Sequence, residues 1–162
     1  MKAFNKDTIL IHFGASKYRK SDFQEIQNSK TITMLNKPQG GFWSCEYTPE
    51  LDFRSEWELY VKDCEWDEDM LNEYFLFKIS NESKVYVIDS EEDLNILEEK
   101  YGYNFKNSHI DCTVIDYEKM AKDYDAIYMT DDGLYENMDK VASWCIESLC
   151  IFNPDIVKEV GM

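Results

Sequence analysis

Hydrophobic positions along the chain fall into short runs of β-branched and aromatic residues, which is the pattern expected of β-strands. The last run, ESLCIFN at residues 147–153, reads as a buried strand that ends at Pro154. The runs at residues 74–80 and 84–89 are separated by NES, which predicts a hairpin turn. The other predicted strands are residues 8–13, 31–35, 41–47 and 126–130.

Apolar residues at helical spacing lie between these runs. Residues 90–102 begin with Ser90 and carry Asp93 three positions later, which resembles a capping box followed by an amphipathic helix. Residues 53–64 repeat apolar side chains every three or four positions, and we expect Trp57 to anchor core there. A further helix is predicted at residues 116–124, a helical turn or loop at 21–29, and a turn at 131–133.

The predicted strands come in clusters separated by helices, without the regular alternation of a βαβ fold. This arrangement predicts the α+β class with mainly antiparallel pairing. The length of 162 residues fits one domain, residues 1–162, that buries a proper core. Hydrophobic residues make up 44% of the chain, which excludes a disordered composition despite the high charge.

The net charge of the chain limits which classes of molecule it is expected to bind. The 33 acidic and 17 basic residues give a formal net charge of -16, which repels phosphate backbones and anionic membranes at long range. A local cationic site remains possible, but the chain has only two arginines, Arg19 and Arg54. The acidity is explained by solubility, or by an acidic face that binds a basic protein or imitates nucleic acid.

The remaining composition points to a cytoplasmic protein without a metal. The five cysteines include no C-x-x-C pair, and the only histidines are His12 and His109, which disfavours a zinc site and fits reduced thiols. The start of the chain does not read as a signal peptide, and no apolar stretch approaches the ~20 residues of a membrane span.

Three residues are candidates for chemistry. His12 ends an apolar strand, Trp43 follows the pair Gly40 and Gly41, and Glu147 begins the last apolar run. Each also has a structural explanation: a packed histidine, a space-filling tryptophan, and the last solvated residue before a buried strand. A carboxylate that enters an apolar strand needs a partner, however, and functional carboxylates often have this setting.

Taken together, these motifs resemble the ADP-ribosyltransferase superfamily, in its branch with a histidine, an aromatic residue and a glutamate. The segment IHFGAS resembles the His-Gly-Ser/Thr motif, with Phe13 inserted between His12 and Gly14. The segment GGFWSC resembles the second motif, with Trp43 in place of a tyrosine. The segment ESLCIFNPDIV resembles the third motif and offers Glu147. The resemblance implies two mainly antiparallel sheets around a central cleft, with flanking helices.

The resemblance also implies the roles of residues. Glu147 and His12 would be catalytic: the carboxylate would stabilise the oxocarbenium-like state and bind the ribose 2′-hydroxyl, and the histidine would hold a ribose hydroxyl. Trp43 would stack on the nicotinamide, with cation–π attraction to the pyridinium. The implied NAD-binding residues are His12, Gly14, Ser16, Gly41, Trp43 and Ser44, and the nearest cations in sequence for the pyrophosphate are Lys17, Arg19 and Lys37.

The resemblance therefore implies an NAD-dependent mono-ADP-ribosyltransferase that uses no metal and modifies a macromolecule, more readily a protein than a nucleic acid. Its small size is similar to that of toxins and of phage or mobile-element effectors. In this interpretation residues 37–45 form the edge of the pocket, and the two glycines let the chain pass close to the dinucleotide. The alternative is a catalytically silent, acidic interaction protein that binds and inhibits a basic protein.

Overall fold

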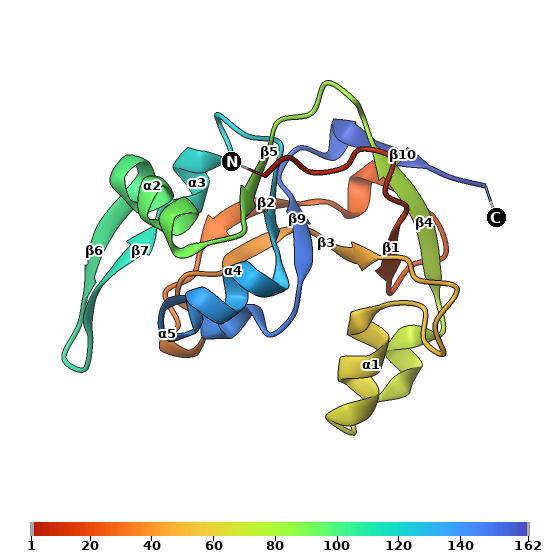
Figure 1. Cartoon of the computed structure of the whole chain (residues 1–162), viewed down its shortest axis with the longest axis horizontal. Helices are drawn as coiled ribbons and strands as arrows, with labels where there is room; N and C mark the ends of the chain where they lie inside the picture. The colour runs from red at the N-terminus through yellow and green to blue at the C-terminus, as the bar shows by residue number, and fades with distance from the viewer. Residues whose placement is uncertain (1, 162) are drawn as a thin grey trace.

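The computed structural model describes residues 2–161, which form an eight-stranded sheet and a separate two-stranded hairpin. The large sheet has the strand order β10-β4-β1-β3-β9-β8-β5. Strand β2 lies off this path and pairs with the N-terminal part of β3. Helices α2 and α3 lie with the hairpin at one end of the molecule, and α1 lies near the other end (Figure 1). The strands are β1 Leu10–Phe13, β2 Gln24–Asn28, β3 Pro38–Glu46, β4 Tyr74–Ile79, β5 Val85–Ile88, β6 Gly102–Lys106, β7 Asp111–Ile115, β8 Ala126–Met129, β9 Ser148–Ile151 and β10 Val157–Glu159. The α-helices are α1 Glu56–Asp63, α2 Glu91–Tyr101, α3 Tyr117–Met120, α4 Asp131–Glu136 and α5 Met138–Val141.

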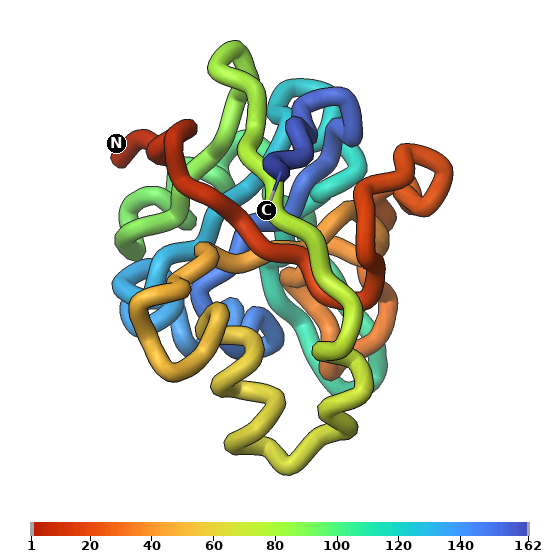
Figure 2. Tube along the Cα trace, turned by 90° about the vertical axis from the view of Figure 1, so that its right-hand side faces the viewer, coloured from red at the N-terminus to blue at the C-terminus, as the bar shows by residue number. Residues whose placement is uncertain are grey.

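The α+β class predicted from the sequence is confirmed. The pair β5 and β8 is parallel, and the other pairs within residues 2–161 are antiparallel. Seen from the β4 end, the N-terminal strand β1 runs beside β4, and α1 hangs below the sheet (Figure 2). Within the described residues, no helix has the length and apolar character needed to cross a membrane.

Strand β3 holds the sheet together because it pairs with three different strands. Its C-terminal end pairs with β1, its middle pairs with β9, and its N-terminal end pairs with β2. The ladder between β1 and β3 contains only Leu10 and Ile11 on the β1 side. Beyond Ile11 the two strands part, so His12 and Phe13 lie where the sheet opens.

Two glycines allow β3 to make these close pairings. Gly40 and Gly41 have φ angles of +73° and +69°, a region that residues with a side chain rarely adopt. A Cβ on Gly40 would lie 2.4 Å from the Glu25 carbonyl oxygen of β2, and a Cβ on Gly41 would lie 2.8 Å from the Ile151 carbonyl oxygen of β9. The glycines therefore make room for neighbouring strands, whereas the sequence suggested room for a ligand.

The sheet separates two hydrophobic cores, because successive residues of a strand point to opposite faces. Helices α2, α3 and α5 cover one face, where Trp144 and Tyr117 are fully buried. The other face is covered by the N-terminal segment and the chain near residues 154–157. Its core contains Phe4, Leu10, Phe75, Phe77, Ile79, Val87, Ala126, Leu149, Ile151, Ile156 and Val157.

The predicted helices are confirmed where caps and apolar spacing agree. The Ser90 side chain accepts a hydrogen bond from the Asp93 backbone N–H, and α2 buries Leu94 and Leu97. Helix α1 is likewise capped by the Ser55 side chain, which accepts from the Glu58 N–H. The helix predicted at 116–124 is present as the shorter α3.

Four local predictions are wrong. Residues 21–29 contain strand β2, because Ile26 packs into the core and the strand pairs with β3. Residues 31–35 contain a 3-10 helix, and Ile32 is 46% exposed. The runs at 74–80 and 84–89 are strands but not a hairpin, since β4 pairs with β1 and β10 while β5 pairs with β8. The predicted turn at 131–133 begins helix α4, capped by the Thr130 side chain.

Candidate functional site

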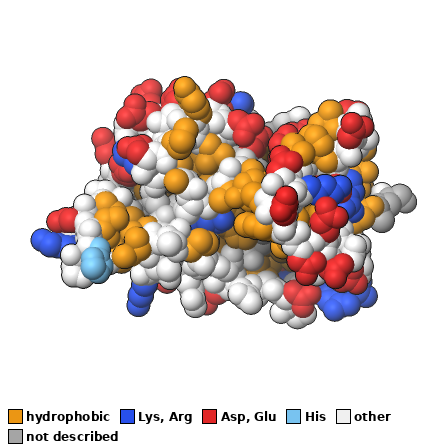
Figure 3. All heavy atoms as spheres, turned by 90° about the horizontal axis from the view of Figure 1, so that it is seen from below, with side chains coloured by type: hydrophobic (Ala, Val, Ile, Leu, Met, Phe, Trp, Pro, Cys, Tyr) orange, Lys and Arg blue, Asp and Glu red, His pale blue; other side chains and the backbone are white. Residues whose placement is uncertain are grey.

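A cavity of about 510 Å³ lies where β1 and β3 part. Most residues of β3 line it, together with Trp57 of α1, Met70 of the following 3-10 helix, and Trp144 and Ile146 from the segment before β9. Hydrophobic side chains gather around the hollow in the middle of this surface (Figure 3). The lining residues are Ile11, His12, Phe13, Gly14, Gln24, Met34, Lys37, Pro38, Gln39, Gly40, Gly41, Trp43, Ser44, Cys45, Trp57, Met70, Trp144, Ile146 and Ser148.

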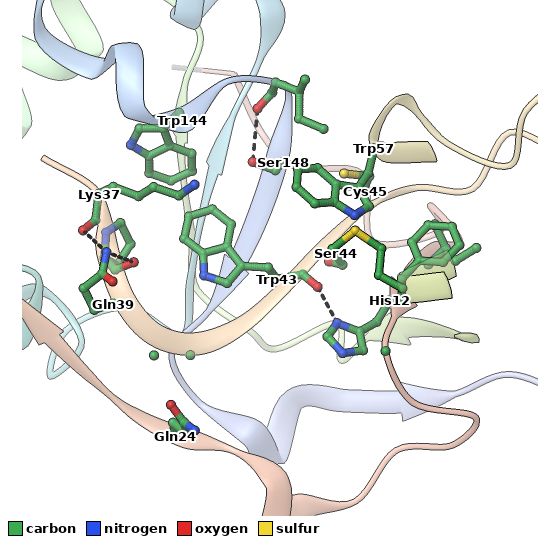
Figure 4. Close-up of a pocket in the computed structure, with 18 of the residues that line it drawn as sticks. His12, Gln24, Lys37, Gln39, Trp43, Ser44, Cys45, Trp57, Trp144 and Ser148 are labelled. Atoms are coloured by element: carbon green, nitrogen blue, oxygen red, sulfur yellow. Dashed lines mark hydrogen bonds between the residues drawn. The ribbon is translucent and has the colours of Figure 1, made fainter. Parts of the chain in front are cut away.

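His12 is fixed at the point where the two strands separate. Its Nδ1 lies 2.6 Å from the Trp43 carbonyl oxygen (Figure 4), and because a carbonyl only accepts, Nδ1 carries the proton. The ring also stacks on Phe42, with centroids 4.1 Å apart. Burial lowers the pKa of His12, although the bond to Trp43 opposes this effect. The imidazole is therefore neutral at pH 7, and Nε2 is left as an acceptor.

Two tryptophans and a lysine form the other end of the cavity. Trp43 packs edge-on against Trp144, with ring centroids 5.0 Å apart. The Trp144 Nε1–H donates to the Asn36 carbonyl oxygen at 2.9 Å, which fixes this indole. Lys37 Nζ lies 4.8 Å from the centre of the Trp43 ring and extends between the two indoles (Figure 4).

The backbone beside Trp144 is strained. Cys145 has φ and ψ of +63° and −51°, and the Ile146 N–H donates to the Trp144 carbonyl oxygen at 2.7 Å. These values define a γ-turn of the rare, unfavourable kind. The turn places Trp144 and Ile146 on the cavity, and stored strain of this sort tends to gather at binding sites.

Two serines add hydroxyl groups to the lining. Ser148 Oγ donates to the Ile146 carbonyl oxygen at 3.1 Å. Ser44 is 4% exposed, and its Oγ has no hydrogen-bond partner among residues 2–161. A buried hydroxyl without a partner is costly, so Ser44 carries hydrogen-bonding capacity that the fold does not use.

The lining contains no acidic side chain. Asp and Glu make up 33 of the 162 residues, so nineteen positions taken at random would include about four. Among the described residues that line this cavity there are none, and Lys37 is the only lysine or arginine. The lining therefore departs from the acidic character of the chain as a whole.

Glu147 lies in a different cavity, of about 320 Å³, which Glu46, Tyr128 and Thr130 also line. Its carboxylate accepts a hydrogen bond from the Tyr128 hydroxyl and another from the Asp131 N–H at 2.9 Å. Burial raises the pKa of Glu147, the Asp131 bond lowers it, and repulsion from Glu46 raises it further. The structure therefore does not bring Glu147 together with His12 and Trp43.

The other residues singled out from the sequence are divided between the cavity and the surface. Gly14, Gly41 and Ser44 line the cavity together with His12 and Trp43. Ser16 is exposed and is not a lining residue. Of the three cations that the sequence proposed for a pyrophosphate, only Lys37 reaches the cavity, and Lys17 and Arg19 are exposed. Trp57, expected in the core, is a half-buried lining residue.

Sequence reasoning missed Ser148 and Trp144 as lining residues. Ser148 begins β9 and Glu147 lies in the bend just before it, and the two residues line different cavities. Alternation along the predicted strand 147–153 would place these two side chains on opposite faces, but the sequence does not tell which face holds the cavity. Trp144 gave no signal beyond its size.

Among residues 2–161 there is no group of three or more His, Cys, Asp or Glu side chains that could hold a metal ion. Comparisons with protein-family models, with curated proteins and with solved structures found no match for this chain.

Proposed function

We propose that this chain is an ADP-ribosyltransferase-like protein that binds NAD in the cavity between β1 and β3, and that Glu147 in the present arrangement does not act on the bound ribose. His12 and Trp43 would contact the nucleotide, and the acid-free lining is the observation that carries the proposal. NAD has two phosphates, and a cavity without carboxylates does not repel them.

The opening of the sheet supports this interpretation. His12 and Trp43 come from two strands that are far apart in sequence, and a hydrogen bond joins them directly at the cavity. Since Nδ1 is engaged by the Trp43 carbonyl, Nε2 remains to accept a hydrogen bond from a ribose hydroxyl. Ser44 also lines this cavity, and its hydroxyl has no hydrogen-bond partner among residues 2–161.

The position of Glu147 argues against nicotinamide cleavage by this residue. Cleavage breaks the bond between ribose C1′ and the nicotinamide nitrogen, the electron pair leaves with nicotinamide, and positive charge develops on the sugar. A carboxylate stabilises that charge only when it lies beside the ribose. The Glu147 carboxylate instead bonds to Tyr128 and to the Asp131 N–H on the other face of the sheet.

A catalytically silent interaction protein is the second candidate, and one surface favours it. Residues 62–70 are all exposed and include Asp63, Glu65, Asp67, Glu68 and Asp69. Among these acids, Trp66 and Met70 are 45% and 41% exposed. An aromatic and apolar surface ringed by acids would suit a basic protein segment.

Binding and cleavage must be measured side by side to test the proposal. NAD binding is followed by isothermal titration calorimetry, and nicotinamide release is followed by chromatography, for the wild type, Trp43→Ala and Glu147→Gln. We expect saturable binding by the wild type and by Glu147→Gln, a large loss in Trp43→Ala, and no release by any of them. Absence of NAD binding in the folded wild type would refute the proposal. Release that disappears in Glu147→Gln would restore the catalytic role of this residue.

A further inference from the structure

Lys37 is held in the cavity without a counterion. The structure shows no ion pair and no hydrogen bond between Lys37 Nζ and any residue from 2 to 161, although the chain contains 33 acids. Its one close contact is the face of Trp43, at 4.8 Å from Nζ to the ring centre. Burial lowers the pKa of Lys37. An ammonium group in this setting keeps its hydrogen-bond donors unused.

The position of Lys37 is set by rigid neighbours. The lysine stands immediately before Pro38, which begins β3, and its side chain enters between Trp43 and the fully buried Trp144. Asn36 just before it is 6% exposed, donates to the Lys140 carbonyl oxygen, and accepts from the Ile115 N–H. The backbone that carries Lys37 is therefore anchored on both sides.

We propose that Lys37, with Trp43 and Trp144, forms a subsite for a phosphate group, so that the ligand of this cavity is a planar molecule carrying phosphate. A phosphate oxygen would accept the unused N–H donors of the ammonium, and such a charge-assisted bond is strong where water is excluded. A carboxylate nearby would repel the phosphate and weaken this selection, and the described residues of the lining include none.

This subsite also fixes how NAD would lie, and in that respect the inference rests on the proposed function. The sequence suggested that Trp43 stacks on the positively charged nicotinamide. In the structure the Lys37 ammonium already lies over that indole, and two cations on one ring repel each other. The phosphates therefore lie at the Trp43 end, the charged nicotinamide lies away from it, and ADP-ribose binds at least as well as NAD.

The experiment compares three ligands with four proteins by calorimetry at fixed pH and salt. The ligands are ADP-ribose, NAD and nicotinamide riboside, which has the charged ring but no phosphate. The proteins are the wild type, Lys37→Met, Lys37→Arg and Lys17→Met, the last being the same change at an exposed lysine outside the cavity. Thermal unfolding of each variant verifies that it is folded.

We expect Lys37→Met to weaken ADP-ribose and NAD by about tenfold to a hundredfold, since one charge-assisted hydrogen bond is lost. Lys37→Arg should retain part of that affinity, Lys17→Met should equal the wild type, and nicotinamide riboside should bind weakly to all four. NAD binding that is unchanged in Lys37→Met would overturn the phosphate subsite and leave the proposed function standing. Binding of nicotinamide riboside as tight as that of ADP-ribose would also overturn the subsite. Absence of binding by all three ligands would overturn both.

Discussion

The two cavities of this protein open on different sides of one sheet and differ in chemistry. The cavity at His12 and Trp43 is aromatic and free of acids, and it contains one unpaired lysine. The cavity at Glu147 is smaller and contains Glu46 and Lys2, and that lysine is neutralised by Asp89 at 3.0 Å. One cavity therefore holds charge that the fold leaves unsatisfied, and the other holds charge that the fold pairs.

The difference depends on a single step along the chain at the start of β9. Ser148, the first residue of the strand, lines the first cavity, and Glu147, in the bend just before it, lines the second. A shift of one residue would exchange them. A sequence motif does not tell which of two neighbouring side chains faces the cavity. Chemistry at a bound ribose requires that the carboxylate be the one that faces it.

The largest effect is expected where β3 separates the two cavities. Gly41→Ala would place a Cβ 2.8 Å from the Ile151 carbonyl oxygen and 2.9 Å from Cys150 Sγ, at a φ of +69°. Overpacking and a left-handed φ together cost about 3 kcal/mol. For a chain of this length we expect the melting temperature to fall by roughly 6–12 °C, and differential scanning calorimetry measures this change.

Gly14→Ala is the matched control for that substitution. Gly14 has a φ of +103°, but a Cβ there would meet nothing within 4 Å. It therefore reports backbone strain alone, about 1–2 kcal/mol. If the two variants melt at the same temperature, crowding against β9 contributes nothing and the account of Gly41 is wrong.

The sequence predicted the parts of the fold that depend on local pattern. Strands β1, β3 and β9 and helix α2 follow from apolar runs and from the Ser90 cap. Strand β2 was missed because Ile26 is its only buried residue, and its extended form depends on pairing with β3. Pairing partners in general depend on distant segments, which is why β4 and β5 were wrongly joined in a hairpin.

The candidate site was predictable in part for the same reason. His12, Trp43 and the cavity's glycines stand out locally, and they do line one cavity. Glu147 was selected because it is a carboxylate at the head of an apolar run and because the family resemblance pointed to it, and neither observation tells which cavity its side chain faces. Lys37 was one of three cations near the motifs, and only the packing of Trp144 against Trp43 distinguishes it.

A smaller effect is expected when the unpaired charge is removed from the first cavity. Lys37→Met keeps the stem of the side chain and removes a half-buried ammonium that has no hydrogen-bond acceptor among residues 2–161. We expect the variant to be more stable than the wild type by about 1 kcal/mol at pH 7, which raises the melting temperature by roughly 2–4 °C. A variant that is less stable than the wild type would mean that the attraction between the ammonium and the Trp43 ring is worth more than the hydration that the ammonium loses on folding.

The Glu147 carboxyl group in the second cavity should make the stability depend on pH. The folded-state pKa of Glu147 is raised above 4.5 by burial, so folding binds this proton more tightly. The stability it contributes is complete below pH 4.5 and is lost as the pH rises through the folded-state value. Relative to the wild type, Glu147→Gln should therefore gain stability between pH 4.5 and 7 in urea titrations. A gap that shrinks over this range would contradict the assigned direction.

His12 should show the opposite and smallest response. Burial lowers its pKa below 6.5, so the unfolded chain binds the proton more tightly and the stability from His12 is lost as the pH falls from 6.5 through the folded-state value. His12→Asn keeps an amide N–H for the Trp43 carbonyl but loses the stacking on Phe42. The variant should be less stable than the wild type at pH 8, and the gap should narrow toward pH 5. Urea titrations of both proteins measure this gap, and a gap that widens instead would place a protonated imidazole at the opening of the sheet and remove the acceptor that the proposed ribose contact requires.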